Sequence, residues 1–191
     1  QTFTGALGGS AFTRFRFAGR GALFAAYLGA LMIPGIVLLI PRFLLIDALG
    51  GVDTIAGLVS TEIVSVWGVF MMRQFFLSLP RETEDAARID GCGEFAIYWR
   101  VVLPLIGPAL GTLGLITFIG SWNNFIGPLI VIRDMEMYTV PIALRSLQGT
   151  GQIPWGAISA GSAIAVLPLL VLFMLASRRL IEGLTAGAVK S

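Results

Sequence analysis

The sequence contains no histidine, one cysteine (Cys92) and one lysine (Lys190) among its 191 residues. Without histidine the chain cannot carry a serine–histidine dyad or a His-Glu-x-x-His zinc site, two common sites in membrane enzymes. A lone cysteine forms no intramolecular disulfide and cannot build a thiolate metal site. A single lysine next to the last residue leaves no Gly-x4-Gly-Lys phosphate loop. These absences exclude the commonest sites of intramembrane enzymes and ATP hydrolysis through a phosphate loop.

Charge is also scarce, and long stretches have none. Charged residues make up 13 % of the chain, hydrophobic residues make up 56 %, and the mean hydropathy is +0.87. A soluble domain is about 45–50 % apolar even when glycine is counted. Because a helix needs roughly 20 mostly apolar residues to cross a bilayer, the pattern predicts four full spans, at residues 22–41, 55–75, 105–131 and 156–177. The predicted fold class is all-α, a polytopic integral membrane protein.

The first residues, QTFTGALGGSAF, are uncharged but too short to cross a bilayer. No methionine begins them and no basic segment precedes them, so they do not resemble a signal peptide. We expect them to be the tail of a fifth span, which predicts that the sequence is truncated at its N-terminus.

The basic residues indicate an orientation. Ten of the 13 lie on one side of the predicted spans, and three, Arg42, Arg133 and Arg145, lie on the other. Because cytoplasmic loops carry the excess of arginine and lysine, the C-terminus and the charged residues 79–104 are predicted to be cytoplasmic. The basic isoelectric point then reflects topology and gives no reason to expect a nucleic-acid partner.

Residues 79–104, called here the charged segment, are the most polar part of the chain. Pro80 suits the first turn of a helix, and Arg81 is spaced to meet Glu84 and Asp85, as Glu84 is to meet Arg88. An Asp-Gly-Cys-Gly turn follows. A second helix then has an apolar face at i, i+3, i+4 and i+7 spacing, formed by Phe95, Tyr98, Trp99 and Val102. This pattern is compatible with a solvated loop. It is also compatible with a docking element, because helices with such aromatic faces usually lie in grooves of a partner or on membranes.

The spacing of this segment resembles a known motif. Asp85-Ala86-Ala87, then Gly91 after three residues, and Val101-x-Leu103-Pro104 after nine more, resemble the EAA loop of bacterial ABC-importer permeases, Glu-Ala-Ala-x3-Gly-x9-Ile-x-Leu-Pro. Asp85 and Val101 are conservative departures. Residues 14–20, 72–82, 120–131 and 183–191 also resemble maltose-transporter-like carbohydrate permeases. The resemblance covers essentially the whole chain, and members of that family usually have six spans.

The resemblance implies a type I ABC-importer permease fold, with a single transmembrane permease domain over residues 1–191, in the bacterial cytoplasmic (inner) membrane. It implies two separate ATPase subunits that bind ATP and Mg, a second homologous permease and an extracytoplasmic solute-binding protein as partners. The chain itself is then expected to be non-catalytic, with no metal site and no bound cofactor. The charged segment would be the coupling loop that contacts an ATPase subunit. Its expected contact residues are Glu84, Asp85, Ala86, Ala87, Asp90, Gly91, Phe95, Leu103 and Pro104.

The C-terminal GLTAGAVKS resembles tails of the family that reach the ATPase pair. We expect Gly187 and Lys190 to make a regulatory contact there. A frayed chain end is the alternative.

Polar residues within predicted spans are candidates for a substrate path. Adjacent amides in hydrocarbon are costly unless they find partners or line a wet cavity, and an aromatic ring beside amides suits sugar binding. Trp122, Asn123 and Asn124 fit that chemistry, although hydrogen bonding between helices is an equal alternative. The family commonly has an acid where Asn124 stands. Glu62, an acid within a predicted span, is a further candidate, or its carboxylate reaches outward to the interface.

The predicted function is the permease subunit of an ATP-driven importer for a sugar or related polar solute. A stand-alone secondary transporter or channel is the alternative, disfavoured because Glu62 has no evident charged partner within a span. A membrane enzyme is disfavoured by the missing histidine.

Two small-xxx-small pairs, Gly5/Gly9 and Gly107/Gly111, predict close helix packing. Three prolines are expected to kink or break spans, namely Pro34, Pro128 and Pro168.

Overall fold

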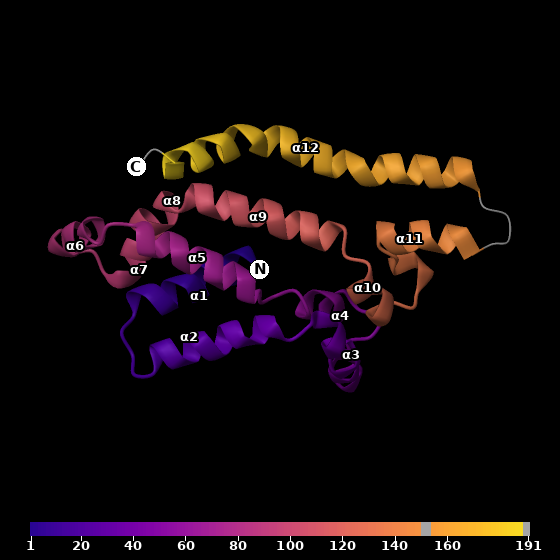
Figure 1. Ribbon diagram of the computed structural model, residues 1–191, viewed down its shortest axis with the longest axis horizontal. Coiled ribbons are helices and arrows are strands. Elements are labelled where there is room, and N and C mark those ends of the chain that lie inside the picture. The colour runs from indigo at the N-terminus through magenta and orange to yellow at the C-terminus, as the bar shows by residue number, and fades with distance from the viewer. Residues whose placement is uncertain (150–153, 189–191) are drawn as a thin grey trace. The chain divides into compact units, whose positions relative to one another are not determined.

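The computed structural model describes residues 1–149 and 154–188, with side chains for 1–149 and 154–175. All regular secondary structure in these residues is helical (Figure 1), as the composition predicts. The described side chains form two compact units, one from residues 1–31 and 64–116 and the other from residues 32–63, 117–149 and 154–175.

The first unit is built on two helices that lie side by side (Figure 1). Its elements are α1 (Thr2–Arg14), α2 (Arg20–Gly29), α5 (Val66–Ser78), α6 (Glu82–Ile89), α7 (Glu94–Ile97), η3 (Tyr98–Val102), α8 (Leu103–Leu105) and the first part of α9 (Gly107–Trp122). A short 3-10 helix, η1 (Ala30–Met32), follows α2. The close pair is α1 and α5.

Glycine allows α1 and α5 to approach each other. A Cβ atom on Gly9 would lie 2.7 Å from Cβ of Met72 and 2.8 Å from the backbone nitrogen of Arg73. Gly5 faces the backbone of α5 in the same way, at Gly68. The predicted close packing is therefore confirmed for this pair. It is wrong for Gly107 and Gly111 within the described part of the chain, where a Cβ on either residue would meet open space.

The core of the first unit reaches into the charged segment. Met72 and Phe76 of α5 and Leu113 of α9 are completely buried. They belong to one cluster that also contains Ala87, Ile97 and Val102 of the charged segment. The segment is thus packed onto the helices that flank it.

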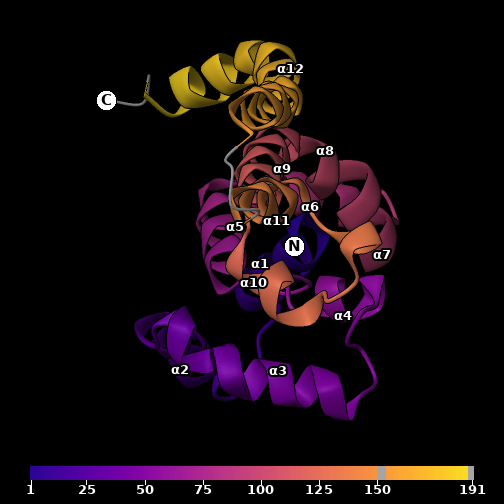
Figure 2. The same ribbon diagram turned by 90° about the vertical axis from the view of Figure 1, so that its right-hand side faces the viewer.

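The second unit contains η2 (Gly35–Leu38), α3 (Leu39–Ala48), α4 (Ile55–Ser60), α10 (Ile126–Val131), η4 (Met135–Met137), α11 (Val140–Ser146), η5 (Leu147–Gly149) and the first part of α12 (Trp155–Ala188). Figure 2 shows α10 beside α3 and α4. Ile46 of α3, Val131 and Ile132 form the buried cluster of this unit.

The Asp53 carboxylate joins two connecting segments of the second unit through hydrogen bonds. The Asp53 side chain accepts hydrogen bonds from the backbone N–H groups of Arg133 and Asp134, and the Asp53 N–H donates to the Val131 carbonyl at 3.0 Å. Asp53 adopts a left-handed φ of 55°, a conformation that aspartate tolerates better than most residues. The two backbone bonds lower the pKa of the Asp53 carboxyl, because they favour its charged form.

Three of the four predicted spans are interrupted. Within the described residues one helix, Trp155–Leu175, is by itself long and apolar enough to cross a membrane, and up to three pass when two broken pairs each count as one span. The break after Met32 occurs at Pro34, as predicted. Residues 61–65 separate α4 from α5, and residues 123–125 separate α9 from α10. Hydropathy measures apolar length and not helical continuity, so the number of spans stays a prediction.

The other two prolines do not break helices. Pro128 lies in the first turn of α10, where its missing N–H has no helical partner to lose. Pro168 lies inside α12, which begins at Trp155 and continues to Ala188, beyond the predicted end at residue 177.

We expect Gly9→Ala to destabilise the protein and Gly111→Ala to leave it unchanged or slightly more stable. The added methyl group at position 9 forces α1 away from α5, an overpacking cost of about 1–3 kcal/mol. At position 111 the methyl group meets open space, and alanine favours the helix by up to about 1 kcal/mol. The midpoint of thermal unfolding in detergent measures both effects. Equal shifts for the two variants would contradict the close contact.

Candidate functional site: the charged segment and a polar helix break

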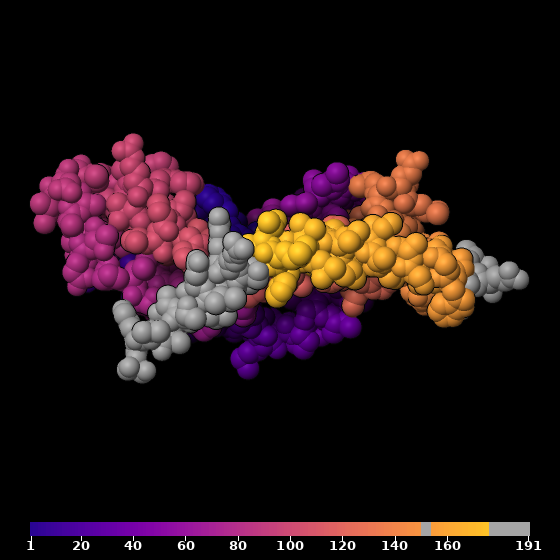
Figure 3. Space-filling model, turned by 90° about the horizontal axis from the view of Figure 1, so that it is seen from above, coloured from indigo at the N-terminus to yellow at the C-terminus, as the bar shows by residue number. Residues whose placement is uncertain are grey.

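The charged segment folds as the predicted helix, turn and helix. Helix α6 has three acidic residues in its first turn, Glu82, Glu84 and Asp85, where the helix dipole favours negative charge. Gly91 supplies the turn with φ 83°. In the space-filling view (Figure 3) the residues of α6 and α7, coloured magenta, are uncovered.

Arg88 connects the two helices of the segment. Its guanidinium donates to both carboxylate oxygens of Glu94, at 2.7 and 3.1 Å, and to Asp85 at 2.7 Å. These bonds raise the pKa of Arg88 further above its usual value. The predicted pairing with Glu84 is present at 3.8 Å.

The pairing predicted for Arg81 is wrong. Arg81 is the N-cap residue of α6, and its Nη2 donates to the Thr13 carbonyl of α1 at 3.4 Å. The Arg81 backbone is helical, and its carbonyl accepts from the Asp85 N–H at 3.0 Å, but its guanidinium bonds to α1 and not to the acids of its own helix.

A buried ion pair holds the segment to α1. Nε of Arg14 lies 2.6 Å from Oε1 of Glu84, and the two side chains are only 12 % and 8 % exposed. The Arg14 guanidinium also lies over the ring of Phe76, 5.9 Å from its centre. This contact was not predicted. Arg14 and Glu84 lie far apart in the sequence, and no local spacing pairs them.

The predicted face of the second helix is confirmed for its aromatic residues and wrong for Val102. The Trp99 ring centre lies 5.9 Å from that of Phe95 and 5.8 Å from that of Tyr98. Phe95 is 78 % and Trp99 40 % exposed, whereas Val102 is buried. Residues 98–102 form a π-helical turn, and its different residue count per turn changes which side chains point inward. Ile97 is buried as well.

The expected ATPase contacts divide into an exposed and a buried group. Asp85, Ala86, Asp90, Gly91, Phe95 and Pro104 are exposed, and Leu103 is half-buried. Glu84 and Ala87 are buried against the chain's own helices, so they do not lie on the surface of the segment. Ile89, which was not predicted, is 87 % exposed close to the turn.

Glu62 and Asn124 form a polar pair at two helix breaks. Glu62 lies in the break between α4 and α5 and not inside a helix; its position within a membrane span stays a prediction. Nδ2 of Asn124 donates to Oε1 of Glu62 at 3.0 Å, and Oδ1 of Asn124 accepts from the N–H of Gly127 at 3.2 Å. Glu62 was expected to have no evident charged partner within a span, and in the structure it has an amide partner, Asn124.

Trp122 and Asn123 also bond within the chain. The indole N–H of Trp122 donates to the Ala165 carbonyl of α12 at 2.9 Å, one turn before Pro168, which cannot donate to the carbonyl at position 164. Asn123 is exposed, and its Nδ2 donates to the Ile119 carbonyl at 2.9 Å. The Trp122 bond joins two helices, as the helix-to-helix interpretation requires, whereas the Asn123 bond is local and returns to α9. A contact with sugar stays a prediction.

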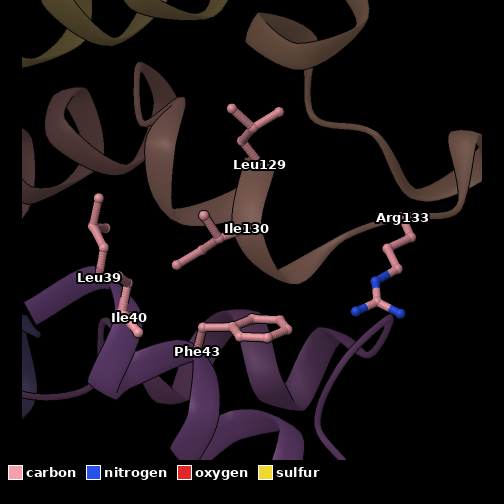
Figure 4. A pocket seen from close by; sticks show the side chains of 6 residues that line it. All are labelled: Leu39, Ile40, Phe43, Leu129, Ile130 and Arg133. Carbon is pink, nitrogen blue, oxygen red and sulfur yellow. The ribbon is translucent and has the colours of Figure 1, made fainter.

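A separate pocket of about 450 Å³ lies between α3 and α10 (Figure 4), lined by Leu39, Ile40, Phe43, Leu129, Ile130 and Arg133. The Arg133 guanidinium lies 5.9 Å from the centre of the Phe43 ring. Apolar side chains dominate the lining, and the candidate substrate residues do not contribute to it. This chemistry does not suit sugar hydroxyl groups.

Two further expectations concern metals and the C-terminal tail. Among the described residues, no three cysteine, aspartate or glutamate side chains come together as a metal site. Lys190 lies outside the described residues, as does the environment of Gly187. The predicted regulatory contact therefore stays a prediction.

Comparison with known proteins decides the family. Residues 1–185 match the family described as binding-protein-dependent transport system inner membrane component. The chain belongs to this family. The predicted resemblance is thereby confirmed.

Similar members of the family are sugar-transport permeases by name. The arabinooligosaccharides transport system permease protein AraQ of Bacillus subtilis is 40 % identical over 176 residues, covering 92 % of this chain and 63 % of that protein. The trehalose/maltose transport system permease protein MalG of Thermococcus litoralis is 34 % identical over 186 residues, covering 94 % and 66 %. The chain thus spans slightly less than two thirds of the length of these relatives.

A solved structure shows the same fold. It is a bacterial ABC transporter involved in the import of the acidic polysaccharide alginate, and one of its chains matches with a TM-score of 0.77 at 22 % identity. The match covers 93 % of this chain and 70 % of that chain. The predicted all-α importer-permease fold is confirmed.

We expect Glu84→Gln to destabilise the protein by about 3 kcal/mol, because Arg14 is left as a buried charge without its partner. Glu82→Gln is the matched control, since it removes an exposed acid from the same first turn. A charge swap, Arg14→Glu with Glu84→Arg, should recover part of the loss in a double-mutant cycle of thermal stability. Equal midpoints for the Glu84 and Glu82 variants would rule out the ion pair as a structural contact.

We expect Asn124→Asp to lower thermal stability at pH 8 and to regain most of the loss at pH 5. Two carboxylates at hydrogen-bonding distance repel when both are charged, and a shared proton restores the bond as the pH falls. The expected loss is about 1–3 kcal/mol. Asn123→Asp is the matched control, because Asn123 is exposed and bonds only to a backbone carbonyl among the described residues. A pH-independent effect at position 124 would contradict the Glu62 contact.

Proposed function

We propose that this chain is the membrane permease subunit of an ATP-driven importer for a sugar or a related polar solute. Family membership and the printed names of its relatives support the proposal. The observation that carries it is the form of the charged segment. The Arg14–Glu84 ion pair holds the segment to α1, while Asp85 and Phe95 of the segment are exposed.

The expected assembly supplies what this chain lacks. We infer two ATPase subunits that bind ATP and Mg, a second related permease and an extracytoplasmic solute-binding protein. The chain itself binds no cofactor in this scheme, and acts as one permease domain. The distribution of basic residues favours a bacterial cytoplasmic-membrane protein with the charged segment and the C-terminus in the cytoplasm. Gly187 and Lys190 would contact the ATPase pair.

In this mechanism the charged segment transmits movement from the ATPase subunits. When those subunits close on ATP, they displace the exposed side of α6 and α7. The buried ion pair and the shared core with α5 make α1 and α5 move with the segment. Transporters of this kind alternate between inward-facing and outward-facing states by such rocking of helices. Trp122, Asn123, Asn124 and Glu62 remain the candidate residues of the solute path.

Reconstitution tests the function. We expect liposomes that contain the full-length permease, its partner permease and the ATPase subunits to hydrolyse ATP faster when binding protein and the cognate solute are added. Arabino-oligosaccharides, maltose and trehalose are the first solutes to screen, since relatives are named for them. Liposomes without the permease pair are the control. Uptake by this chain alone would instead support a secondary transporter or channel.

The same liposomes test the charged segment. Phe95→Ala removes a side chain that is 78 % exposed, so the fold should remain intact while affinity for the ATPase subunits falls about thirtyfold. Asp85→Lys should uncouple ATP hydrolysis from solute uptake. Met135→Ala, an apolar side chain that is 74 % exposed in the second unit, is the matched control. Normal uptake in both variants of the segment would overturn its coupling role without excluding a transport function.

A further inference from the structure

We propose that the end of α1, the α1–α2 connection and Arg81 form a binding site for the phosphate of an anionic phospholipid headgroup. The site consists of Arg16, Arg20 and Arg81, and the exposed Phe15 and Phe17 flank Arg16 in the sequence. It is independent of which solute the chain transports and of whether it transports one.

Two guanidinium groups converge at the end of α1. Nη1 of Arg20 donates to the carbonyls of Thr13 at 3.3 Å and Phe15 at 3.1 Å, and Nη2 of Arg81 donates to the same Thr13 carbonyl at 3.4 Å. These carbonyls lie where the helix ends and have no intrahelical N–H partner. Because both side chains bond to one oxygen atom, their two positive charges are close neighbours.

These charges are not balanced within the described residues. The nearby Arg14 is neutralised by Glu84, whereas Arg16, Arg20 and Arg81 form no ion pair with a described carboxylate. Arg16 and Arg81 are exposed. Close like charges repel each other, and an anion that accepts hydrogen bonds from several guanidinium groups removes this cost. A phosphate group offers the required oxygen atoms.

Aromatic side chains frame the cations. Phe15 and Phe17 are 58 % and 44 % exposed and flank the exposed Arg16 in the connection between α1 and α2. Arginine next to exposed phenylalanine is typical of surfaces at the headgroup level of a membrane.

The position along the chain identifies the phosphate as that of a lipid. Helix α1 has no charged residue before Arg14, and the family is an inner-membrane family. The first charges after an apolar helix lie where hydrocarbon gives way to headgroups. Clusters of basic residues beside such helix ends bind anionic lipids. A phospholipid satisfies the cations with its phosphate and the exposed rings with its glycerol and acyl region.

Native mass spectrometry of the purified full-length protein tests this proposal. Phosphatidylglycerol should bind more tightly than phosphatidylcholine. Arg16→Gln should weaken phosphatidylglycerol binding about fivefold, and Arg16→Gln combined with Arg81→Gln should weaken it about thirtyfold. Arg16 is exposed, so the single variant should fold normally. Thermal midpoints confirm folding of the double variant.

Arg100→Gln is the matched control, since it removes an exposed arginine from the same unit, in η3. Equal weakening by Arg100→Gln and Arg16→Gln would show that only net charge matters. Displacement of the lipid by millimolar inorganic phosphate would show a site for soluble anions. Unchanged lipid affinity in Arg16→Gln, with weaker binding of the ATPase subunits, would show a protein contact. Each of these three results overturns the proposal.

Discussion

Arg14 and Glu84 carry opposite charges into the interior of the first unit and meet at 2.6 Å. Neither charge is stable in an apolar core without the other, so the position of α6 is fixed relative to the end of α1. The apolar contacts of Ala87, Ile97 and Val102 then complete the attachment. The ion pair and these apolar contacts attach the charged segment to the apolar helices, and the outer side chains of the segment remain exposed.

The packing of α1 on α5 depends on the absence of side chains at Gly5 and Gly9. In a membrane, helices gain little from burying apolar surface, since lipid is as apolar as leucine, and close backbone contact replaces that term. The aromatic rings of Phe12 and Phe24, 5.2 Å apart, add a contact between α1 and α2. These contacts and the ion pair all involve α1, so α1 holds the elements of the first unit together.

The sequence predicted the class of fold well because composition and apolar length decide it. The charged segment was also predictable, since its glycine turn and its leucine–proline end have fixed spacing. Helix continuity was not predictable, because apolar length is averaged over about 20 residues and does not register short breaks such as residues 61–65 and 123–125. The partners of Glu62 and Glu84 are far away in sequence, and no local pattern reports a contact over that separation. The π-helical turn at 98–102 likewise moved Val102 off the predicted face, and periodicity assumes a constant number of residues per turn.

Gly9 and Gly91 both belong to the first unit, but they tolerate different replacements. At Gly9 the constraint is volume, and even the smallest side chain meets the backbone of α5. At Gly91 no atom lies within 4 Å of the missing Cβ, and the constraint is the backbone angle alone. Asparagine, which adopts left-handed angles with modest strain, is admissible at Gly91 and excluded at Gly9. Natural variation at these two positions should therefore differ in kind, with side-chain size limiting one and torsional preference limiting the other.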